Sequence, residues 1–171
     1  MEFFKTVEAR VSIRAYLAKP VEESKVEKIL HAACLAPSAG NFQAYRIIVV
    51  KGKKGREALS AASRGQTFII DAPVCLAFVA DGSRDRQKYG KRGEEFYSVQ
   101  DATIAAAYAQ LAAAALGLGT VWVGGYDEEK VCSVLKLKPH EKPVALLPLG
   151  YPAEEREGHE RRKLDEVASE L

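Results

Sequence analysis

The sequence predicts one layered domain in which helices and strands interleave, of the α/β or the α+β class. Stretches with the apolar spacing of amphipathic helices are separated by short runs rich in Val, Ile and Leu, which are typical of strands. A length of 171 residues suits one domain with a buried core, and no repeat, low-complexity run or linker divides residues 1–171. With 47% hydrophobic and 28% charged residues, the composition is that of an ordinary globular protein.

Helices are predicted at five places. In Val21–Leu35 the apolar residues fall on one helix face, at Val26, Ile29, Leu30 and Ala33. The other four helices are expected from the N-terminus to about Glu8, over Lys53–Ser63, over Asp101–Leu116 and from the capping residue Asp127 to Leu135. Gly117 fits the C-cap of the Ala-rich helix over Asp101–Leu116.

Four short apolar runs are predicted to be strands, over Tyr45–Val50, Ala72–Ala80, Thr120–Gly124 and Val144–Leu149. Pro73 lies near the start of the second run, where a strand tolerates proline. Arg10–Ala15 alternates polar and apolar residues, which is typical of an extended segment. Periodicity does not give the order of the strands in the sheet.

The Ala-rich helix is apolar almost all round. Residues 102–126 carry no charge, but they are mostly Ala and are interrupted by Gly117 and Gly119. We therefore interpret them as a buried helix followed by a strand and not as a membrane span. Such a helix should be buried on all sides. In a chain this short, a partner subunit is expected to provide part of the surface that covers it.

Charge and cysteine content narrow the class of protein. Lys and Arg number 25 against 23 acidic residues, which leaves a net charge of +2 and no basic excess for binding nucleic acid. Cys34, Cys75 and Cys132 are widely spaced and form no metal-ligand pattern with the scattered histidines. Packed, reduced thiols in a cytoplasmic protein are therefore expected. The N-terminus lacks the long apolar region of a signal peptide.

The segment Arg10-Val11-Ser12-Ile13-Arg14 is the first with a chemical signature. In an extended segment Arg10, Ser12 and Arg14 share one face, while Val11 and Ile13 point into the core. Two guanidinium groups and a hydroxyl suit a phosphate dianion, which Arg binds in a bidentate manner. The alternative is an edge strand with solvated arginines.

Three further segments carry polar or glycine-rich patterns. Ala36–Gln43 offers backbone N–H groups and amides to a polar planar ligand, or simply stops the preceding helix. Gly117–Gly125 lets a flat ring approach the backbone, or is a C-cap followed by a bulged strand. Leu149–Pro152 is followed by the basic triplet Arg161-Arg162-Lys163, which on its own is an ordinary solvated surface.

The order and spacing of these segments resemble the nitroreductase family of FMN-dependent oxidoreductases along nearly the whole chain. The matching segments are Arg10–Arg14, Pro20-Val21 before a helix, Ala36–Gln43 before a strand, Ala72–Val74, Asp101, Gly117–Gly125 and Leu149–Pro152 followed by arginine. Ala44-Tyr45 departs from the Pro-Trp that commonly follows the glutamine in the family. The resemblance implies an α+β three-layer sandwich around a mixed or antiparallel sheet, in an intertwined homodimer.

The resemblance also implies a cofactor and the residues that bind it. Arg10, Val11, Ser12 and Arg14 would take the phosphate and ribityl end of FMN, joined by Arg161 or, as an adjacent alternative, Arg162. Pro37, Ser38, Ala39, Asn41 and Gln43 would reach the flavin of the partner subunit. Gly124 and Gly125 would place a backbone N–H near the flavin N5, and Gln66 is a further candidate beside the ring or the phosphate.

Asp81–Tyr97 is the most polar tract, with nine charged residues and three glycines, and is expected to be an exposed excursion long enough to act as a lid. Its basic residues Arg84, Arg86, Lys88, Lys91 and Arg92 either meet the adenosine phosphate of NADPH or form a solvated face. Its aromatic residues Tyr89, Phe96 and Tyr97 either stack on an aromatic acceptor or anchor the lid.

The implied activity is a ping-pong transfer of electrons from NADH or NADPH through flavin N5 to a small acceptor such as a nitroaromatic, a quinone, a free flavin or an enone. No catalytic side chain is then required, because the flavin carries the chemistry. Three alternatives stay open. They are a flavin-binding carrier or sensor without turnover, a specialised relative such as a reductive dehalogenase, an azoline-forming dehydrogenase or a flavin-fragmenting enzyme, and a purely structural scaffold.

Overall fold

The computed structural model describes residues 2–170. The helices are α1 (Phe3–Ala9), α2 (Glu23–Cys34), α3 (Lys53–Ala62), α4 (Phe68–Asp71), α5 (Gly82–Arg92), α6 (Ser98–Ala115) and α7 (Glu128–Leu135). Three short turns of helix are η1 (Ala39–Asn41), η2 (Gly93–Tyr97) and η3 (Leu164–Glu166). The strands are β1 (Tyr45–Val50), β2 (Val74–Asp81), β3 (Gly119–Thr120) and β4 (Glu141–Gly150).

The four strands form one sheet in the order β1-β2-β4-β3, and all three ladders are antiparallel. Tyr45 of β1 lies opposite Ala80 of β2, and Val74 of β2 lies opposite Leu149 of β4. The parallel element is an isolated bridge between Ser12 and Thr120, which joins the N-terminal segment to β3. Of the two sheet types expected, the antiparallel one is therefore present.

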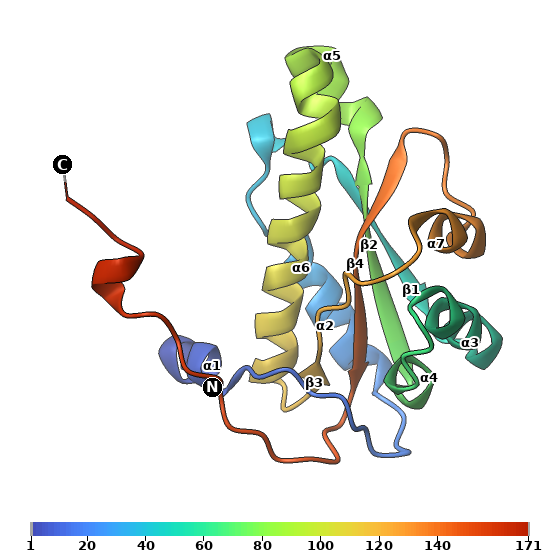
Figure 1. Ribbon diagram of the computed structural model, residues 1–171, viewed down its shortest axis with the longest axis vertical. Helices are drawn as coiled ribbons and strands as arrows, with labels where there is room; N and C mark the ends of the chain where they lie inside the picture. Colours follow the sequence, from blue (N-terminus) through green and yellow to red (C-terminus); the bar gives the residue numbers. More distant parts are fainter. Residues whose placement is uncertain (1, 171) are drawn as a thin grey trace.

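Helices cover both faces of the sheet, which gives the expected α+β three-layer sandwich (Figure 1). One face of β2, through Val74, Leu76 and Phe78, packs against α2 and α6. The other face, through Cys75 and Ala77, packs against α3, α4 and α7. Because both faces of β2 are buried, its sequence is a continuous apolar run and not an alternating one.

Five helices and four strands lie where the sequence predicts them, with two differences in extent. The strand expected over Thr120–Gly124 is paired over only two residues of β3, and beyond it Val123 forms an isolated bridge to Leu146. β4 begins at Glu141 and so is longer than expected. Asp127 accepts a hydrogen bond from the Lys130 N–H, so its predicted capping role is confirmed.

The tract 81–97 is helical, and its residues are exposed or half-buried except Gly82, Asp85 and Gly93, as expected of an exposed excursion. Asp81 caps α5 by accepting the Ser83 N–H, and α5 runs through η2 into α6 with a break at Gly90, where φ is +58°. Asp85 is fully buried in this segment. Because the tract has few apolar residues, sequence periodicity does not predict this helix, which packs against the start of α6.

The Ala-rich helix α6 is buried on one side only. Ala105, Ala109 and Ala113 lie in the core, but Ala107 on the opposite side is exposed and Tyr108 is 41% exposed. The expected burial on all sides is therefore not achieved within one chain. Apolar side chains are also exposed in α1, and the C-terminal segment extends away from the body (Figure 1).

Among residues 2–170, no helix is long and apolar enough to cross a membrane, and no cluster of His, Cys, Asp and Glu has metal-binding geometry. Cys75 is buried, as expected of a packed thiol, and Cys132 is half-buried. Cys34 is exposed, which corrects the expectation for that residue, because it lies in the last turn of α2 beyond the helix face that packs on the core.

Candidate functional site

The N-terminal segment lies along β3. The bridge between Ser12 and Thr120 is reinforced by the Ile13 N–H, which donates to the Thr120 carbonyl at 3.0 Å. Ile13 is buried and Val11 packs beside it, as the alternation predicted. Position 119 has no room for a larger residue, because a Cβ atom there would lie 2.8 Å from the Ile13 side chain.

The C-terminal segment crosses the N-terminal one and is tied to it by Glu154. The Glu154 carboxylate accepts the backbone N–H groups of Arg14 at 2.5 Å and Ala15 at 3.0 Å, and it pairs with Arg156 at 2.8 Å. The hydrogen bond from the Arg14 N–H, followed by that from Arg156, lowers the pKa of Glu154. This crossing brings the residues after Arg156 beside Arg10.

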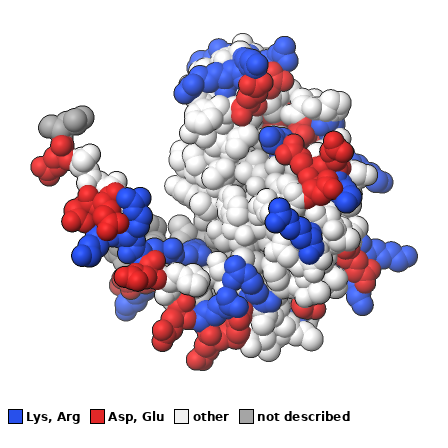
Figure 2. Space-filling model, viewed as in Figure 1, with Lys and Arg blue, Asp and Glu red and all other residues white. Residues whose placement is uncertain are grey.

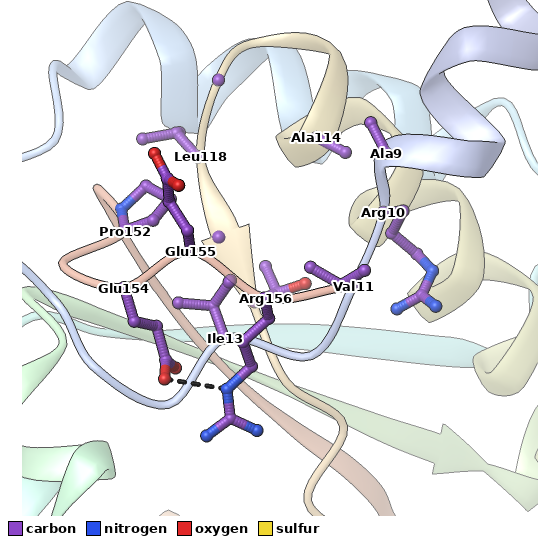
Figure 3. Close-up of a pocket in the computed structure, with 13 residues that line it drawn as sticks. Ala9, Arg10, Val11, Ile13, Ala114, Leu118, Pro152, Glu154, Glu155 and Arg156 are labelled. Atoms are coloured by element: carbon purple, nitrogen blue, oxygen red, sulfur yellow. Dashed lines mark hydrogen bonds and ion pairs between the residues drawn. The ribbon is translucent and has the colours of Figure 1, made fainter. Parts of the chain in front are cut away.

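Arg10, Val11, Ser12 and Arg161 line one small pocket of about 170 Å³. Its other walls are the segment from Arg156 to His159. Neither Arg10 nor Arg161 forms an ion pair with a carboxylate in the described part of the chain, so both guanidinium groups are free to bind an anion. A second pocket of about 270 Å³ adjoins it, with Arg10 and Val11 on one side and Pro152 and Glu154 on the other (Figure 3).

Two of the arginines expected at this site lie elsewhere. Arg14 is exposed and lines neither pocket. Arg162 pairs with Glu166 at 3.2 Å and also donates to the Glu166 carbonyl. Of the two adjacent arginines left open by the sequence, the structure therefore has Arg161 at the pocket.

The loop from Ala36 to Gln43 is held by one buried carboxylate, at its middle and directly after its last residue. The Ala39 N–H donates to Oδ1 of Asp101 at 2.9 Å, and the Ala44 N–H donates to Oδ2 at 3.1 Å. Asp101 is 2% exposed, so these hydrogen bonds are shielded from water. The carboxylate fixes the position of the loop relative to the start of α6.

The loop presents polar groups outward. Gly40, Asn41 and Gln43 all have positive φ, of +53°, +60° and +50°. The Gln43 N–H donates to Ser38 Oγ at 3.0 Å, and the Gln43 side-chain amide donates to Asn41 at 3.2 Å. Pro37, Asn41 and Gln43 are exposed, whereas Ser38 and Ala39 are half-buried. The loop is preorganised by its own hydrogen bonds.

Gln66 lies beside the glycine pair that follows Trp122. Its side-chain amide donates to the Gly125 carbonyl at 3.3 Å and to the Ser63 carbonyl at 2.9 Å. The Cβ position of Gly125 is open, and that of Gly124 has the Trp122 indole nitrogen as its nearest atom, at 3.4 Å. Both glycines are exposed, so a planar group has room to approach this backbone.

The predicted site residues do not form one cleft within a single chain. Asp101, which holds the 36–43 loop, is near the start of α6, and Ala114, which lines the larger pocket, is near its end. At about 1.5 Å of rise per residue these positions are about 20 Å apart. In Figure 1 the α2–β1 loop accordingly lies toward the α5 end of α6, and α1 lies at the other end.

Asp101 and Glu154 each anchor one of the site segments, and sequence patterns alone give neither residue this role. Asp101 belongs to the segments that resemble the family, and its position as a single charge before an uncharged stretch is a signal for a buried, hydrogen-bonded carboxylate. Glu154 follows Leu149–Pro152 directly, but nothing in the sequence identifies its partners, which are 140 and 139 residues away.

The fold of this chain is shared with known structures. The structure matches NfrA2 of B. megaterium with a TM-score of 0.92 and 29% identity, over 99% of this chain and 74% of that one. It matches a nitroreductase family protein of Clostridium novyi with a TM-score of 0.81 and 28% identity, over 90% of this chain and 87% of that one.

Sequence comparison agrees with the structural one. The profile of the Nitroreductase family matches residues 7–69 and 63–151. The chain is 35% identical to a Thermus thermophilus protein named NADH dehydrogenase, over 92% of this chain and 90% of the relative. It is 33% identical to a Bacillus subtilis protein named FMN reductase, over 90% of this chain and 67% of the relative. The chain belongs to the nitroreductase family.

Proposed function

We propose that the protein is a homodimeric, FMN-dependent enzyme that passes electrons from NADH or NADPH to a small acceptor by a ping-pong mechanism. Its membership of the nitroreductase family makes it an NAD(P)H-dependent oxidoreductase. The identity of the cofactor, the use of one pocket by both substrates and the acceptor class are the parts that we propose. Nitroaromatics, quinones, free flavins and enones are the acceptors to be tested.

The observation that carries the proposal is the convergence of two distant arginines on one pocket. Arg10 and Arg161 line it together with Ser12, and both arginines lack a carboxylate partner in residues 2–170. Two guanidinium groups and a hydroxyl match the charge and the hydrogen-bonding needs of a phosphate dianion. The terminal phosphate of FMN is such a group, and the smaller pocket is therefore proposed as its site.

The second part of the proposal is that another copy of the chain completes the cleft. The 36–43 loop and the arginine pocket are at opposite ends of α6, so one chain offers only half of a site at each end. The exposed side of α6 is uncharged and includes the small residues Thr103, Ala107 and Ala115, which allow a second helix to approach closely. Phe3 and Phe4 of α1, 65% and 77% exposed, add apolar surface for the same partner.

In that dimer each residue of the site holds or orients the cofactor. Ser38, Ala39 and Asn41 of one chain would face the ring bound by the other chain, and Asp101 keeps this loop in place. Gly124 and Gly125 have the open backbone needed to donate an N–H near the ring, with Gln66 beside them. Bound FMN itself supplies the hydride chemistry at N5, so no catalytic side chain is assigned.

The absorbance of the purified protein tests the proposal. We expect yellow protein, or protein that gains flavin absorbance and quenches flavin fluorescence when FMN is added. Under anaerobic conditions NADH or NADPH should bleach the bound flavin, and an acceptor added afterwards should restore the colour. A protein that takes up no FMN would overturn the proposal, and one that holds FMN but is not bleached would be a binding protein without turnover.

Location in the cytoplasm is a further part of the proposal. The three cysteines are free thiols in the described structure, and such thiols suit a reducing compartment. Cell fractionation with an antibody against the protein would test this location directly.

A further inference from the structure

The basic residues of α5 fall into two groups according to their partners. Arg86 pairs with Glu94 at 3.0 Å, and Lys91 pairs with Glu95 at 3.5 Å, so the carboxylates of η2 neutralise these two cations. The second group, Arg84, Lys88 and Arg92, forms no ion pair in the part of the chain that the structure describes. Figure 2 shows the basic side chains gathered at the α5 end of the molecule.

Two of the unpaired cations belong to one helix face. Arg84 and Lys88 are four residues apart, a spacing at which like charges repel and destabilise a helix. The one carboxyl of α5, that of Asp85, is buried inside the segment; burial raises its pKa, while the nearby Arg84 lowers it. Neither Arg84 nor Lys88 forms an ion pair in residues 2–170, so this helix face presents positive charge.

Aromatic rings lie beside these cations. Phe42 and Tyr89 pack edge to face with centroids 6.0 Å apart, and Tyr89 packs in the same way on Tyr97 at 5.1 Å. Lys88 Nζ is 5.7 Å from the Phe42 ring centroid, and Arg92 Nε donates to the Tyr97 hydroxyl at 3.0 Å. We call this group of cations and aromatic rings the α5 cradle; it consists of Arg84, Lys88, Arg92, Phe42, Tyr89 and Tyr97.

The cradle is attached to the loop proposed to face the flavin. Phe42 belongs to that loop, and Arg84 Nε donates to the Phe42 carbonyl at 2.9 Å. Tyr89 lies so close to Gly40 that a Cβ atom there would be 2.6 Å from its hydroxyl. A ligand whose reactive end stacks at the flavin would therefore extend its remote end toward α5.

We infer that the α5 cradle binds the 2′-phosphorylated adenosine end of the dinucleotide, so that the enzyme prefers NADPH to NADH. The inference rests on the proposed function, since it assigns a residue set to the donor of that reaction. Arg84 and Lys88 would bind the 2′-phosphate, and the rings beside them would pack against the adenine. NADH lacks that phosphate and would leave the cations unpaired.

The test uses adenosine 2′,5′-bisphosphate and adenosine 5′-monophosphate as probes of the full-length protein, by calorimetry or NMR titration. The bisphosphate should bind more tightly. Lys88→Ala and Arg84→Ala should each weaken its binding by about tenfold, the scale of one hydrogen bond to a charged group. Lys91→Ala removes a cation of the same helix that is already paired, so it is the matched control and should bind as the original protein does.

A second readout uses turnover. Lys88→Ala should raise KM for NADPH by a similar factor of about ten and leave KM for NADH unchanged. Equal binding of the two probes, or equal losses in Lys88→Ala and Lys91→Ala, would overturn the inference. If inorganic phosphate binds the site as tightly as the bisphosphate does, the site is a general anion site, and this result would overturn the inference too. The probe titrations need no flavin, so a failure to bind FMN contradicts the proposed function alone.

Discussion

Replacing Arg10 by Ala is expected to weaken FMN binding by about ten- to a hundredfold. Arg10 is half-buried, lines the pocket with Ser12 and Arg161, and has no carboxylate partner in the described structure. A hydrogen bond to a charged group contributes about 1.5–3 kcal/mol. Since about 1.4 kcal/mol corresponds to a factor of ten in Kd, the loss of one such bond gives this range.

The assay is a titration of flavin-free protein with FMN, followed by the quenching of flavin fluorescence. Arg14→Ala is the matched control, because Arg14 belongs to the same segment and carries the same charge but lines neither pocket. It should retain FMN nearly as the original protein does. Undiminished binding by Arg10→Ala, or an equal loss in Arg14→Ala, would refute the assignment of the pocket to the phosphate.

Five other substitutions give distinct outcomes. Arg161→Ala should weaken FMN binding in the same titration, whereas Arg162→Ala should not, since Arg162 is engaged with Glu166. Asp101→Ala leaves two N–H groups without an acceptor and should lower the free energy of unfolding by about 2–4 kcal/mol in urea; an unchanged midpoint would contradict the anchoring role. The pKa of Glu154 is lower than its usual 4.5, so the stability that the ionised carboxylate gives is present above that pH and is lost on acidification. In Glu154→Gln the free energy of unfolding should therefore fall less steeply below about pH 4.5 than in the original protein. Leu at Gly124 should alter the flavin spectrum without changing the far-UV circular dichroism, and an unaltered spectrum would count against a ring beside Gly124.

Helices and strands with strong local patterns could be predicted from sequence. α2 has its apolar residues at helical spacing, and β2 is a continuous apolar run that ends in a capping aspartate. α5 could not be predicted, because little of its sequence is apolar, it packs against η2 and α6, and it is interrupted at Gly90, where φ is positive. Its helical state depends on contacts that periodicity does not encode.

In the candidate site, too, local sequence patterns predict some features, whereas others depend on tertiary contacts. Alternation places Arg10, Ser12 and Arg14 on one face; the structure has Arg10 and Ser12 at one pocket and Arg14 outside it, beyond the isolated bridge at Ser12. The role of each residue in binding stays a prediction. The choice between Arg161 and Arg162 depends on how the C-terminal segment crosses the N-terminal one. That crossing is fixed by a carboxylate at the other end of the chain, which no local pattern identifies.

Mixing two defective chains tests most directly whether the cleft is shared between subunits. Arg10→Glu should remove the phosphate pocket, and Asn41→Trp should block the loop that faces the ring. Each variant alone should bind no FMN, but heterodimers formed by co-expression should bind one FMN per dimer, because one of their two clefts combines an intact Arg10 with an intact loop. Heterodimers that bind no FMN, or a monomer of the original protein that holds FMN, would contradict the account.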